Sequence, residues 1–499
     1  MVQMTLLLLS STAIALASFG PDVRIDHQYN PTHECRDCAI AIGPGAPSGH
    51  LIYVAFEDDS TVGPFRVRAD IMFQKSTDAG RTWLPTDLLI QGGDPVAERP
   101  DITTDSDGNV YIVYADHDTA VGGSTQISCV RSSDGGATWT EPARVDDSMY
   151  AGGIAAARVA ADSAGNLFVA WIQVQPPNTH VFTSVSTDKG ATWSPRVRVD
   201  NDTLTDESNH ADVFVQPGTN HYLVAATTWR LFEGQYVPCA FLYRSTDRGQ
   251  TFEPGVQLDT FNWDAFDPHV VADRDHIVCN YFGSSRAVRD TMVVEARTFY
   301  TEADSWGSPV RITKLDSLHE LYYSGPLAIS GDGRVHTALM IQDTADSRYN
   351  IYYTSSSDHG VSWSDLELVT DDTTVNSYYP DIGADIAGYA YVVWYEFDGA
   401  LGTEWFTTNS PAGIAEETPN AKLRTPKGSP SVVRGVLVLA ERPSTSASSL
   451  LDISGREVMD LKPGTNDVRA LAPGVYFIRE GLGIRGEGLG KTQKVVVTR

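Results

Sequence analysis

Residues Ser132-Ser133-Asp134-Gly135-Gly136-Ala137-Thr138-Trp139 form one of five copies of the pattern S-[ST]-D-x-G-x-[TS]-[WF]. The other four copies occupy residues 76–83, 186–193, 245–252 and 356–363. A degenerate copy ends at Trp306 and has Thr301 in place of the aspartate. The closing aromatic residues are spaced 54 to 59 residues apart. Such a period is typical of propellers and other repeat architectures.

Each octapeptide predicts a β-hairpin turn. The aspartate carboxylate can accept backbone N–H bonds across the turn, and the glycine supplies a residue with positive φ. The aromatic residue is expected to be buried beneath the turn. We therefore expect the five aspartates to be structural and not catalytic.

A second motif, P-x-[IV]-x-x-D, precedes each octapeptide and predicts the innermost strand of a repeat. It begins near residues 37, 100, 157, 211, 268, 326 and 380. The last repeat lacks an outer strand, and Val23-Arg24-Ile25-Asp26 resembles the outer strand Val197-Arg198-Val199-Asp200. The N-terminal segment is therefore predicted to complete the last repeat, because ring closure removes exposed sheet edges. We predict an all-β propeller of seven four-stranded blades, with six blades as the alternative.

The polar residues at the turn that follows the inner strand are predicted to be turn-formers. They are Asp105, Asp162, Asp273 and Asp385.

Residues 1–17 are predicted to be a secretory signal peptide. An apolar run beginning at Leu6 leads to Ala15-Leu16-Ala17, a small-x-small cleavage pattern. An N-terminal membrane anchor is the alternative, although no stretch approaches the roughly 20 apolar residues of a spanning helix. We expect no transmembrane span in the mature chain.

Composition restricts the partners. The net charge of −27 argues against non-specific binding to nucleic acid or to an anionic membrane. Cys35 and Cys38 form a C-x-x-C without the further ligands of a zinc site, so neither a metal nor a cofactor is predicted. In an exported protein a local disulfide between them is expected, with free thiols as the alternative.

The repeat pattern stops after Asn409. The propeller is therefore assigned to residues 18–409, a proline-rich linker to 410–430 and a small β-sandwich domain to 431–499. The sandwich contains D-x-S-G-R-x-V from Asp452, L-x-P-G-V-Y-F from Leu471 and K-x-V-V-x-R from Lys494.

This tail resembles the C-terminal sorting domain of the type IX secretion system, in which these elements occur in the same order. The resemblance implies export across an outer membrane, the secretion machinery as a partner, and a secreted or cell-surface location. A generic immunoglobulin-like or flagellar-hook-like β-sandwich is the alternative.

The octapeptides resemble the Asp boxes of sialidases and other BNR-repeat proteins, and the resemblance covers about residues 23–409. It implies a propeller fold. Asp boxes also occur in propellers that act on other glycans or only bind partners, so the resemblance says less about activity.

Residues beside the inner-strand proline are the candidate ligand site, because inner strands surround the axis of a propeller. The position before the proline is occupied by Arg36, Arg99, Ala156, His210, Asp267, Gly325 and Tyr379. The position after it is occupied by Cys38, Asp101, Arg158, Asp212, His269, Leu327 and Asp381. Such clustered charged and aromatic groups suit a polar ligand.

The sialidase resemblance implies three arginines that clamp a carboxylate, a Tyr–Glu nucleophile pair and an aspartic acid/base. We assign the catalytic roles to Tyr379, Glu396 and Asp101, with Tyr323 and Glu320 as alternatives for the Tyr–Glu pair. The predicted substrate-binding residues are Arg36, Arg99, Arg158, His210, Asp267, His269 and Asp381. The sequence departs from the family at Arg36-Asp37-Cys38, where sialidases have R-I-P, and in its seven blades, where known sialidases have six.

Three functions remain open at this stage. The first is a secreted sialidase-type glycoside hydrolase. The second is a non-catalytic propeller that binds glycan or protein at the cell surface. The third is another glycan-active enzyme, such as a lyase.

Overall fold

The computed structural model describes most of the chain. In the N-terminal part the described residues are 19–27, 33–44, 51–61, 66–92, 96–118, 124–147, 154–175, 178–200, 205–259, 263–285, 292–313, 319–323, 325–343, 347–398 and 402–411. In the C-terminal part they are 431–434, 436–439, 448–451, 456–462, 464–468, 471, 474–480 and 492–498. The chain divides into two compact units, Met1–Glu416 and Glu417–Arg499. The described ranges hold strands and turns, and none of their segments is a helix long and apolar enough to cross a membrane.

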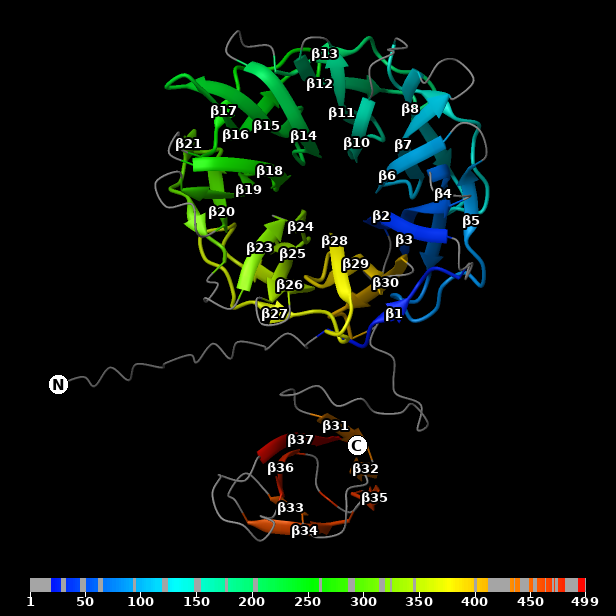
Figure 1. Cartoon of the computed structure of the whole chain (residues 1–499), viewed down its shortest axis with the longest axis vertical. Coiled ribbons are helices and arrows are strands. Elements are labelled where there is room, and N and C mark those ends of the chain that lie inside the picture. Colours follow the sequence, from blue (N-terminus) through cyan, green and yellow to red (C-terminus); the bar gives the residue numbers. More distant parts are fainter. Residues whose placement is uncertain are drawn as a thin grey trace, which may run out of the picture. The chain divides into compact units, whose positions relative to one another are not determined.

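The first unit consists of seven antiparallel sheets arranged around one axis, the blades of a propeller (Figure 1). Blade 1 comprises β2 (His33–Ile42), β3 (Ile52–Thr61), β4 (Arg66–Ser76) and β5 (Leu88–Gln91). Blade 2 comprises β6 (Val96–Thr104), β7 (Val110–Asp118), β8 (Ser124–Ser132) and β9 (Ala143–Arg144). Blade 3 comprises β10 (Ile154–Ala161), β11 (Leu167–Gln175), β12 (Asn178–Ser186) and β13 (Val197–Arg198).

The remaining blades follow the same order from the axis outward. Blade 4 comprises β14 (Thr205–Val215), β15 (Tyr222–Phe232), β16 (Gln235–Ser245) and β17 (Val256–Gln257). Blade 5 comprises β18 (Trp263–Ala272), β19 (His276–Ser285), β20 (Val293–Tyr300), β21 (Ser305–Trp306) and β22 (Val310–Arg311). Blade 6 comprises β23 (His319–Tyr323), β24 (Leu327–Ile329), β25 (Val335–Asp343), β26 (Arg348–Ser356) and β27 (Glu367–Leu368).

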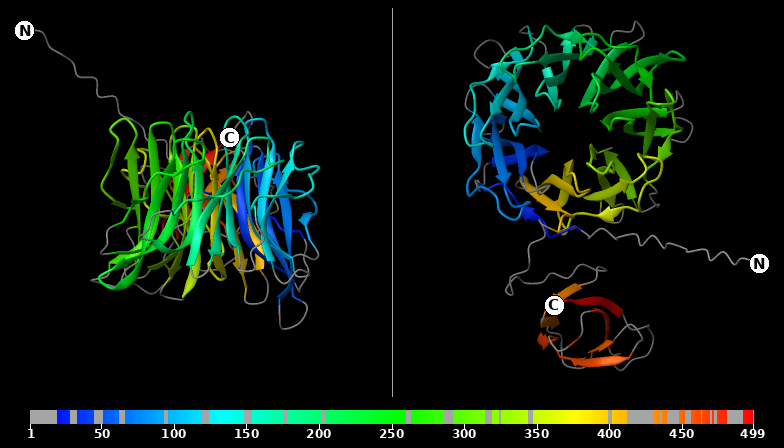
Figure 2. Two further views of the ribbon diagram at one scale, coloured as in Figure 1. Left: turned by 90° about the horizontal axis from the view of Figure 1, so that it is seen from above. Right: turned by 180° about the vertical axis from the view of Figure 1, so that it is seen from behind.

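Blade 7 is made from both ends of the propeller, as predicted. Its strands β28 (Asn376–Ala384), β29 (Ala390–Phe397) and β30 (Gly402–Thr408) are completed by β1 (Val23–Arg24), which pairs antiparallel with β30. The Asp26 carboxylate accepts the Glu404 N–H at 2.9 Å and extends this pairing. The prediction of seven blades is confirmed, and the closed ring is visible from both sides (Figure 2).

The octapeptides form the predicted turns. In all five, the first serine hydroxyl donates to the aspartate at 2.7–2.8 Å, and the aspartate accepts the N–H of the seventh residue at 2.8–2.9 Å. The glycines have φ between 79° and 87°. These aspartates are therefore held in turn hydrogen bonds, which confirms their structural role.

The four aspartates after the inner strands also form turns. Each accepts backbone N–H bonds from residues two to four positions later, at 2.7–3.0 Å. The predicted turn-forming role of Asp105, Asp162, Asp273 and Asp385 is confirmed.

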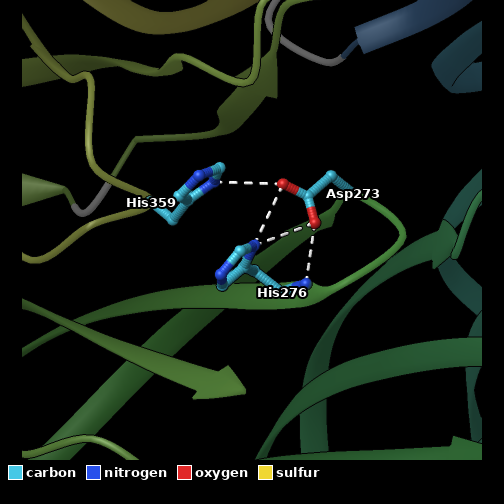
Figure 3. A group of neighbouring side chains, drawn as sticks. All are labelled: Asp273, His276 and His359. Atoms are coloured by element: carbon cyan, nitrogen blue, oxygen red, sulfur yellow. Dashed lines mark hydrogen bonds and ion pairs between the residues drawn. The ribbon is translucent and has the colours of Figure 1, made fainter. Parts of the chain in front are cut away.

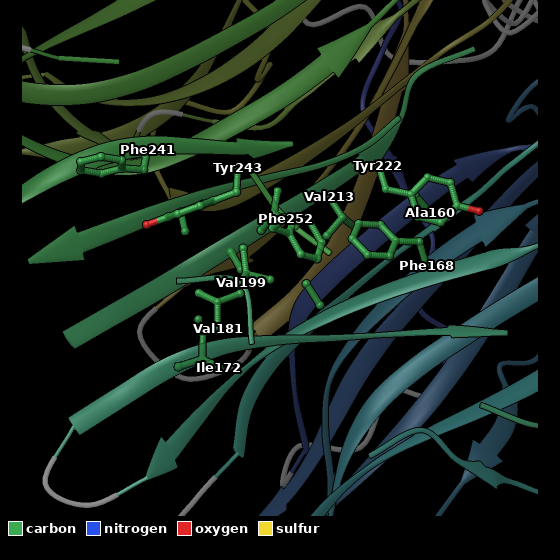
Figure 4. Close-up of a cluster of buried hydrophobic side chains, with 14 of the residues drawn as sticks. Ala160, Phe168, Ile172, Val181, Val199, Val213, Tyr222, Phe241, Tyr243 and Phe252 are labelled. Carbon is green, nitrogen blue, oxygen red and sulfur yellow. The ribbon is translucent and has the colours of Figure 1, made fainter. Parts of the chain in front are cut away.

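Hydrophobic cores lie between neighbouring blades. The core between blades 3 and 4 joins Phe168 and Val181 to Val213, Tyr222 and Phe241 (Figure 4). Phe252, which closes the blade 4 octapeptide, is 8% exposed and belongs to the same core. Each octapeptide thus fixes a turn and also contributes to the contact between blades.

The second unit is also all-β. A five-stranded sheet has the order β31 (Ser431–Arg434), β37 (Thr492–Thr498), β36 (Gly474–Glu480), β33 (Ser448–Leu451) and β34 (Glu457–Leu461). A second sheet pairs β32 (Val436–Leu439) with β35 (Gly464–Asp467). Leu450, Leu461, Val468 and Tyr476 form its buried cluster. The predicted signal peptide, residues 1–17, and nearly all of the predicted linker lie outside the described residues.

Candidate functional site

A β-bulge interrupts the inner strand of every blade near its middle. In six blades the bulged residue is not glycine and yet has positive φ, a conformation that costs of order 1–3 kcal/mol. With Gly325 of blade 6, φ ranges from 43° to 67°. The bulged residues are Asp37, Arg99, Ala156, His210, Asp267 and Tyr379, and in blade 6 the equivalent residue, Gly325, lies in the break between β23 and β24.

The bulge ring is the name used below for two sets of residues. The first set is these seven residues, and the second is the residue two positions later in each blade. The second set is Ala39, Asp101, Arg158, Asp212, His269, Leu327 and Asp381. Because the bulge recurs in all blades it belongs to the architecture, and what differs between blades is the side chain presented. The ring contains all predicted substrate-binding residues except Arg36, and two of the three predicted catalytic residues.

In blade 1 the sequence alignment of the inner strands was wrong by one residue. The regular pairing stops at Arg36 with Glu57 and resumes at Ala39 with Ala55, so Asp37 and Cys38 form the bulge. Asp37, not Arg36, is therefore equivalent to Arg99, and Ala39, not Cys38, is equivalent to Asp101. The Arg36 side chain lies outside the described residues, and its predicted substrate contact stays a prediction.

The cysteines of blade 1 are free thiols, which contradicts the expected disulfide. Cys35 lies on the regular part of β2 and Cys38 on its bulge. Burial raises the pKa of the Cys35 and Cys38 thiols. Neither has the lowered pKa of a reactive cysteine.

Three ring aspartates bond across blades. Asp101 accepts the N–H of Val159 in blade 3 at 2.7 Å. Asp212 accepts the N–H of Val270 in blade 5 at 2.9 Å. Asp381 likewise accepts the N–H of Ile40 in blade 1 at 2.8 Å. These bonds fix the carboxylates at the inner strands and leave a second oxygen on Asp101 and Asp212 for other contacts.

Arg158 is the cation in the electrostatic surroundings of these carboxylates. Burial raises the pKa of Asp101 to about 7, although Arg158 and the bond from Val159 act in the opposite direction. Burial also raises the pKa of Asp381. For Asp212 the effect of burial is outweighed, mainly by the hydrogen bond and charge of His269, and its pKa is lowered. The ring thus holds carboxyl groups with opposite pKa shifts.

Two histidines lie beside Asp212. The ring centroids of His210 and His269 are 5.0 Å apart, with the rings at 83° to each other. His269 Nδ1 lies 3.5 Å from Asp212 Oδ2, and His210 Nδ1 lies 3.6 Å from Asp267 Oδ1. Burial lowers the pKa of His210 to about 4, so His210 is neutral at pH 7. The structure therefore brings three predicted substrate-binding residues, His210, Asp267 and His269, together with Asp212.

Tyr379 and Glu396 do not form the predicted pair. The Glu396 carboxylate accepts a bond from Trp394 Nε1 at 3.2 Å and one from the Ser377 hydroxyl at 3.5 Å. Because neighbouring strand residues face opposite sides of a sheet, Glu396 points away from the side occupied by Tyr395. Tyr379 instead stacks on Tyr395, with ring centroids 6.4 Å apart and planes at 10°.

The tyrosine cluster is a feature that the sequence analysis missed. Tyr378 stacks on Tyr395 at 5.3 Å and contacts Tyr349 of blade 6 at the same centroid distance. Tyr379 is 49% exposed. The register set by the turn at Asp385 would pair Tyr378 with Glu396, and the β-bulge between Tyr378 and Asp381 shifts this pairing to Tyr395, so the turn alone did not indicate the cluster.

Arg99 is the other predicted clamp arginine whose side chain is described. Arg99 is exposed, and its backbone N–H donates to Glu57 Oε2 at 2.9 Å. Of these two arginines, Arg158 is the one whose charge acts on Asp101, Asp212 and Asp381. Within the described residues, no three ring side chains are close enough to share a metal ion.

Comparison with known families gives one match. Residues 67–266 match the BNR repeat-like domain family. The matched segment runs from β4 in blade 1 to β18 in blade 5 of the propeller. None of the curated proteins compared with this sequence matches it.

Several solved structures are similar in fold. A protein of unknown function from Dyadobacter fermentans is 16% identical, with a TM-score of 0.49 over 79% of this chain and 99% of that one. An α-L-arabinanase from Penicillium chrysogenum, complexed with arabinobiose, is 14% identical, with a TM-score of 0.41 over 79% and 96%. A sialidase from Streptococcus pneumoniae is 9% identical, with a TM-score of 0.41 over 78% and 98%. Since one fold hosts many activities, these likenesses concern the fold alone.

Proposed function

We propose that this chain is a glycan-active propeller that binds carbohydrate at the bulge ring. The observation that carries the proposal is the half-exposed Tyr379, which stacks on Tyr395 and belongs to a ring whose other positions carry carboxyl and imidazole groups. The apolar face of a sugar ring packs on an aromatic face, while its hydroxyls need hydrogen-bonding groups around it. The ring offers both kinds of group from rigid strands.

The binding proposal predicts that Tyr379→Ala weakens glycan affinity. A glycan array with the mature chain would identify the ligand, and calorimetry would measure its affinity. Loss of an aromatic contact at the centre of a site is expected to weaken binding roughly tenfold or more. Tyr236→Ala, which removes a tyrosine that is 56% exposed on blade 4, serves as the matched control. Equal affinities of wild type and Tyr379→Ala would contradict the proposal.

Glycoside hydrolysis is the second candidate, favoured by the opposite pKa shifts of Asp101 and Asp212. A carboxyl group with a pKa of about 7 can donate a proton to a leaving group at neutral pH, while an ionised neighbour acts as base or nucleophile. Asp101→Asn is expected to lower turnover by roughly 10²–10⁴-fold without abolishing glycan binding. Hydrolysis that persists in Asp101→Asn would exclude this assignment, and binding without turnover in wild type would identify a non-catalytic glycan-binding protein.

Charge favours a neutral glycan over a sialoside. Arg158 lies near three carboxyl groups, of which Asp212, with its lowered pKa, is ionised at neutral pH and compensates its charge. A substrate carboxylate would meet the same acidic groups and be repelled by those that are ionised. The sialidase assignment, with Arg36, Arg99 and Arg158 as the clamp, predicts cleavage of a fluorogenic α-sialoside. We expect little or none, and rapid cleavage lost in both Arg158→Ala and Tyr379→Phe would reverse this preference.

The raised pKa of Asp101 also predicts a pH effect on stability. The native carboxyl stays protonated up to about pH 7, whereas the unfolded chain releases this proton near its ordinary value of 3.8. The contribution of the protonated Asp101 carboxyl to the free energy of unfolding is therefore complete below about pH 4 and is lost as the pH rises through 7. Asp101→Asn cannot ionise, so its free energy of unfolding, relative to wild type, should increase from pH 4 to pH 7.5. Urea denaturation measures this difference.

The exposed Asp365→Asn serves as the control for that experiment. Its stability relative to wild type is expected to change much less over the same pH range. An Asp101→Asn profile parallel to that of wild type would show that Asp101 has no raised pKa in the folded state.

We also propose that the protein is exported and that the C-terminal unit is a sorting domain. The support is the sequence of residues 1–17 and the three motifs of the tail, whose described part forms two sheets. Fusion of residues 417–499 to a reporter should direct its export by a type IX machinery. Retention of that reporter in the periplasm would contradict the sorting role.

A further inference from the structure

Asp273, His276 and His359 form a cluster on the side of the propeller that carries the octapeptide turns (Figure 3). Asp273 lies on the turn between β18 and β19 of blade 5, and His276 is the first residue of β19. His359 is the fourth residue of the octapeptide in blade 6. The potential ligand atoms of the three side chains all lie within 4.8 Å of one another. None of the three belongs to the bulge ring.

Both imidazoles face the Asp273 carboxylate. Asp273 Oδ1 accepts the N–H groups of Asp275 and His276, each at 2.7 Å. His276 Nδ1 lies 3.1 Å from Oδ1 and 3.2 Å from Oδ2, and His359 Nδ1 lies 3.0 Å from Oδ2. The backbone bonds therefore fix the carboxylate between the two rings, with Oδ2 within reach of both.

We propose that Asp273, His276 and His359 bind a divalent transition-metal ion, Zn²⁺ in the first instance, that links blades 5 and 6. Two imidazole nitrogens and one carboxylate oxygen are a common zinc ligand set, and water completes the coordination. Bonds of about 2.0–2.2 Å in a tetrahedron place ligand atoms about 3.3–3.5 Å apart. The observed Nδ1–Oδ2 distances need to lengthen by only a few tenths of an ångström.

The imidazole rings must turn to bind the ion together. They stack with centroids 3.9 Å apart and planes at 12°, so their Nδ1 lone pairs run side by side and do not converge. The χ2 torsion of histidine has a broad energy minimum, which makes this rotation inexpensive. The side chains of His276 and His359 are 24% and 32% exposed, which leaves room for rotation and for a bound water.

Equivalent positions in other blades show what is unusual about this cluster. In blade 2 the turn aspartate Asp105 bonds to Asn109, and blade 3 has Asp162 with Asn166 in the same relation. The fourth octapeptide residue of blade 3, Lys189, forms an ion pair with Asp107 of blade 2 at 2.7 Å. Contact between a turn and the next blade therefore does not require histidine. His276 of blade 5 occupies the position of Asn109 and Asn166, and His359 of blade 6 occupies the position of Lys189. Both positions therefore carry metal-binding side chains.

The test is calorimetric titration of Zn²⁺ into the chelator-treated mature chain. We expect one equivalent of Zn²⁺ to bind. His276→Asn reproduces the Asp–Asn pair of blades 2 and 3. His359→Gly reproduces Gly135 of blade 2 and suits the positive φ of 58° at this position. Loss of one ligand should weaken binding at least roughly tenfold in each variant.

The matched control is Lys189→Ala, which removes the corresponding contact between blades without removing a ligand. It should bind Zn²⁺ as wild type does, and Co²⁺ bound to wild type should show visible absorption that both histidine variants lose. Absence of binding to wild type would overturn the proposal. Undiminished binding in the folded histidine variants would also overturn it and would indicate ligands elsewhere, such as Cys35 and Cys38.

Discussion

Deletion of residues 18–27 is expected to destabilise the propeller more than the removal of any other segment of similar length at its surface. The deletion removes β1, which pairs Val23 with Phe406 and Arg24 with Trp405. It also removes Ile25, which is 0% exposed and whose N–H donates to Glu404 O at 2.9 Å. The third strand of blade 7 becomes an open edge.

The expected loss is large because several effects coincide. Full burial of an isoleucine side chain contributes about 1.5–3 kcal/mol. The Glu404 N–H, which donates to Asp26, and the Glu404 carbonyl, which accepts from Ile25, lose their protein partners, and each such bond contributes about 0.5–1.5 kcal/mol. With the lost strand pairing, we expect a decrease on the order of 5 kcal/mol, comparable with the whole stability of many domains.

Thermal denaturation of the shortened and full mature chains checks this expectation. A chain truncated after residue 416 is the control, because residues 417–499 form a separate compact unit. The control should retain the melting transition of the propeller. A chain without residues 18–27 that melts at the temperature of the control would show that the ring does not depend on closure by β1.

Gly325→Ala is the second change with a large expected effect. Gly325 has φ of 67°, and a Cβ atom there would lie 1.7 Å from the carbonyl oxygen of Ala338. That oxygen is part of the backbone of β25, the neighbouring strand, so it cannot move as a flexible side chain can. Gly325 O also accepts a bond from Asn280 Nδ2 at 3.1 Å. We expect the free energy of unfolding to fall by about 3–5 kcal/mol.

Gly108→Ala separates the clash from the backbone strain. Gly108 has φ of 82°, but no atom lies within 4 Å of the position that a Cβ would occupy. The substitution should therefore cost only the strain of about 1–2 kcal/mol. Chemical denaturation of both variants gives the comparison. Similar losses for the two substitutions would mean that blade 6 can shift to accept a side chain, and that glycine is not required in its bulge.

The fold was predictable because its decisive signals are local. Each octapeptide specifies its own turn through a serine, an aspartate and a glycine, so five copies define blades without knowledge of distant contacts. Closure by the N-terminal strand was also predictable. Val23-Arg24-Ile25-Asp26 repeats a pattern whose aspartate bonds to the third strand of the blade, as Asp146 does with Ile127 N–H.

The candidate site was less predictable because it depends on register and on contacts between blades. Blade 1 has Cys38 where blades 2, 5, 6 and 7 have proline, and the alignment shifted there by one residue. Tyr379 and Glu396 are on paired strands, yet it is Tyr395 that shares a face with Tyr379. His276 and His359 come from neighbouring blades, and no local motif links them.

Carbohydrate binding by the bulge ring is tested most directly by a crystal structure of the mature chain with the glycan identified by array screening. We expect electron density for a sugar ring against Tyr379, with hydroxyls within hydrogen-bonding distance of ring groups such as Asp101 or Asp267. Density for the glycan at the octapeptide side or at the outer strands, with the bulge ring unliganded, would contradict it.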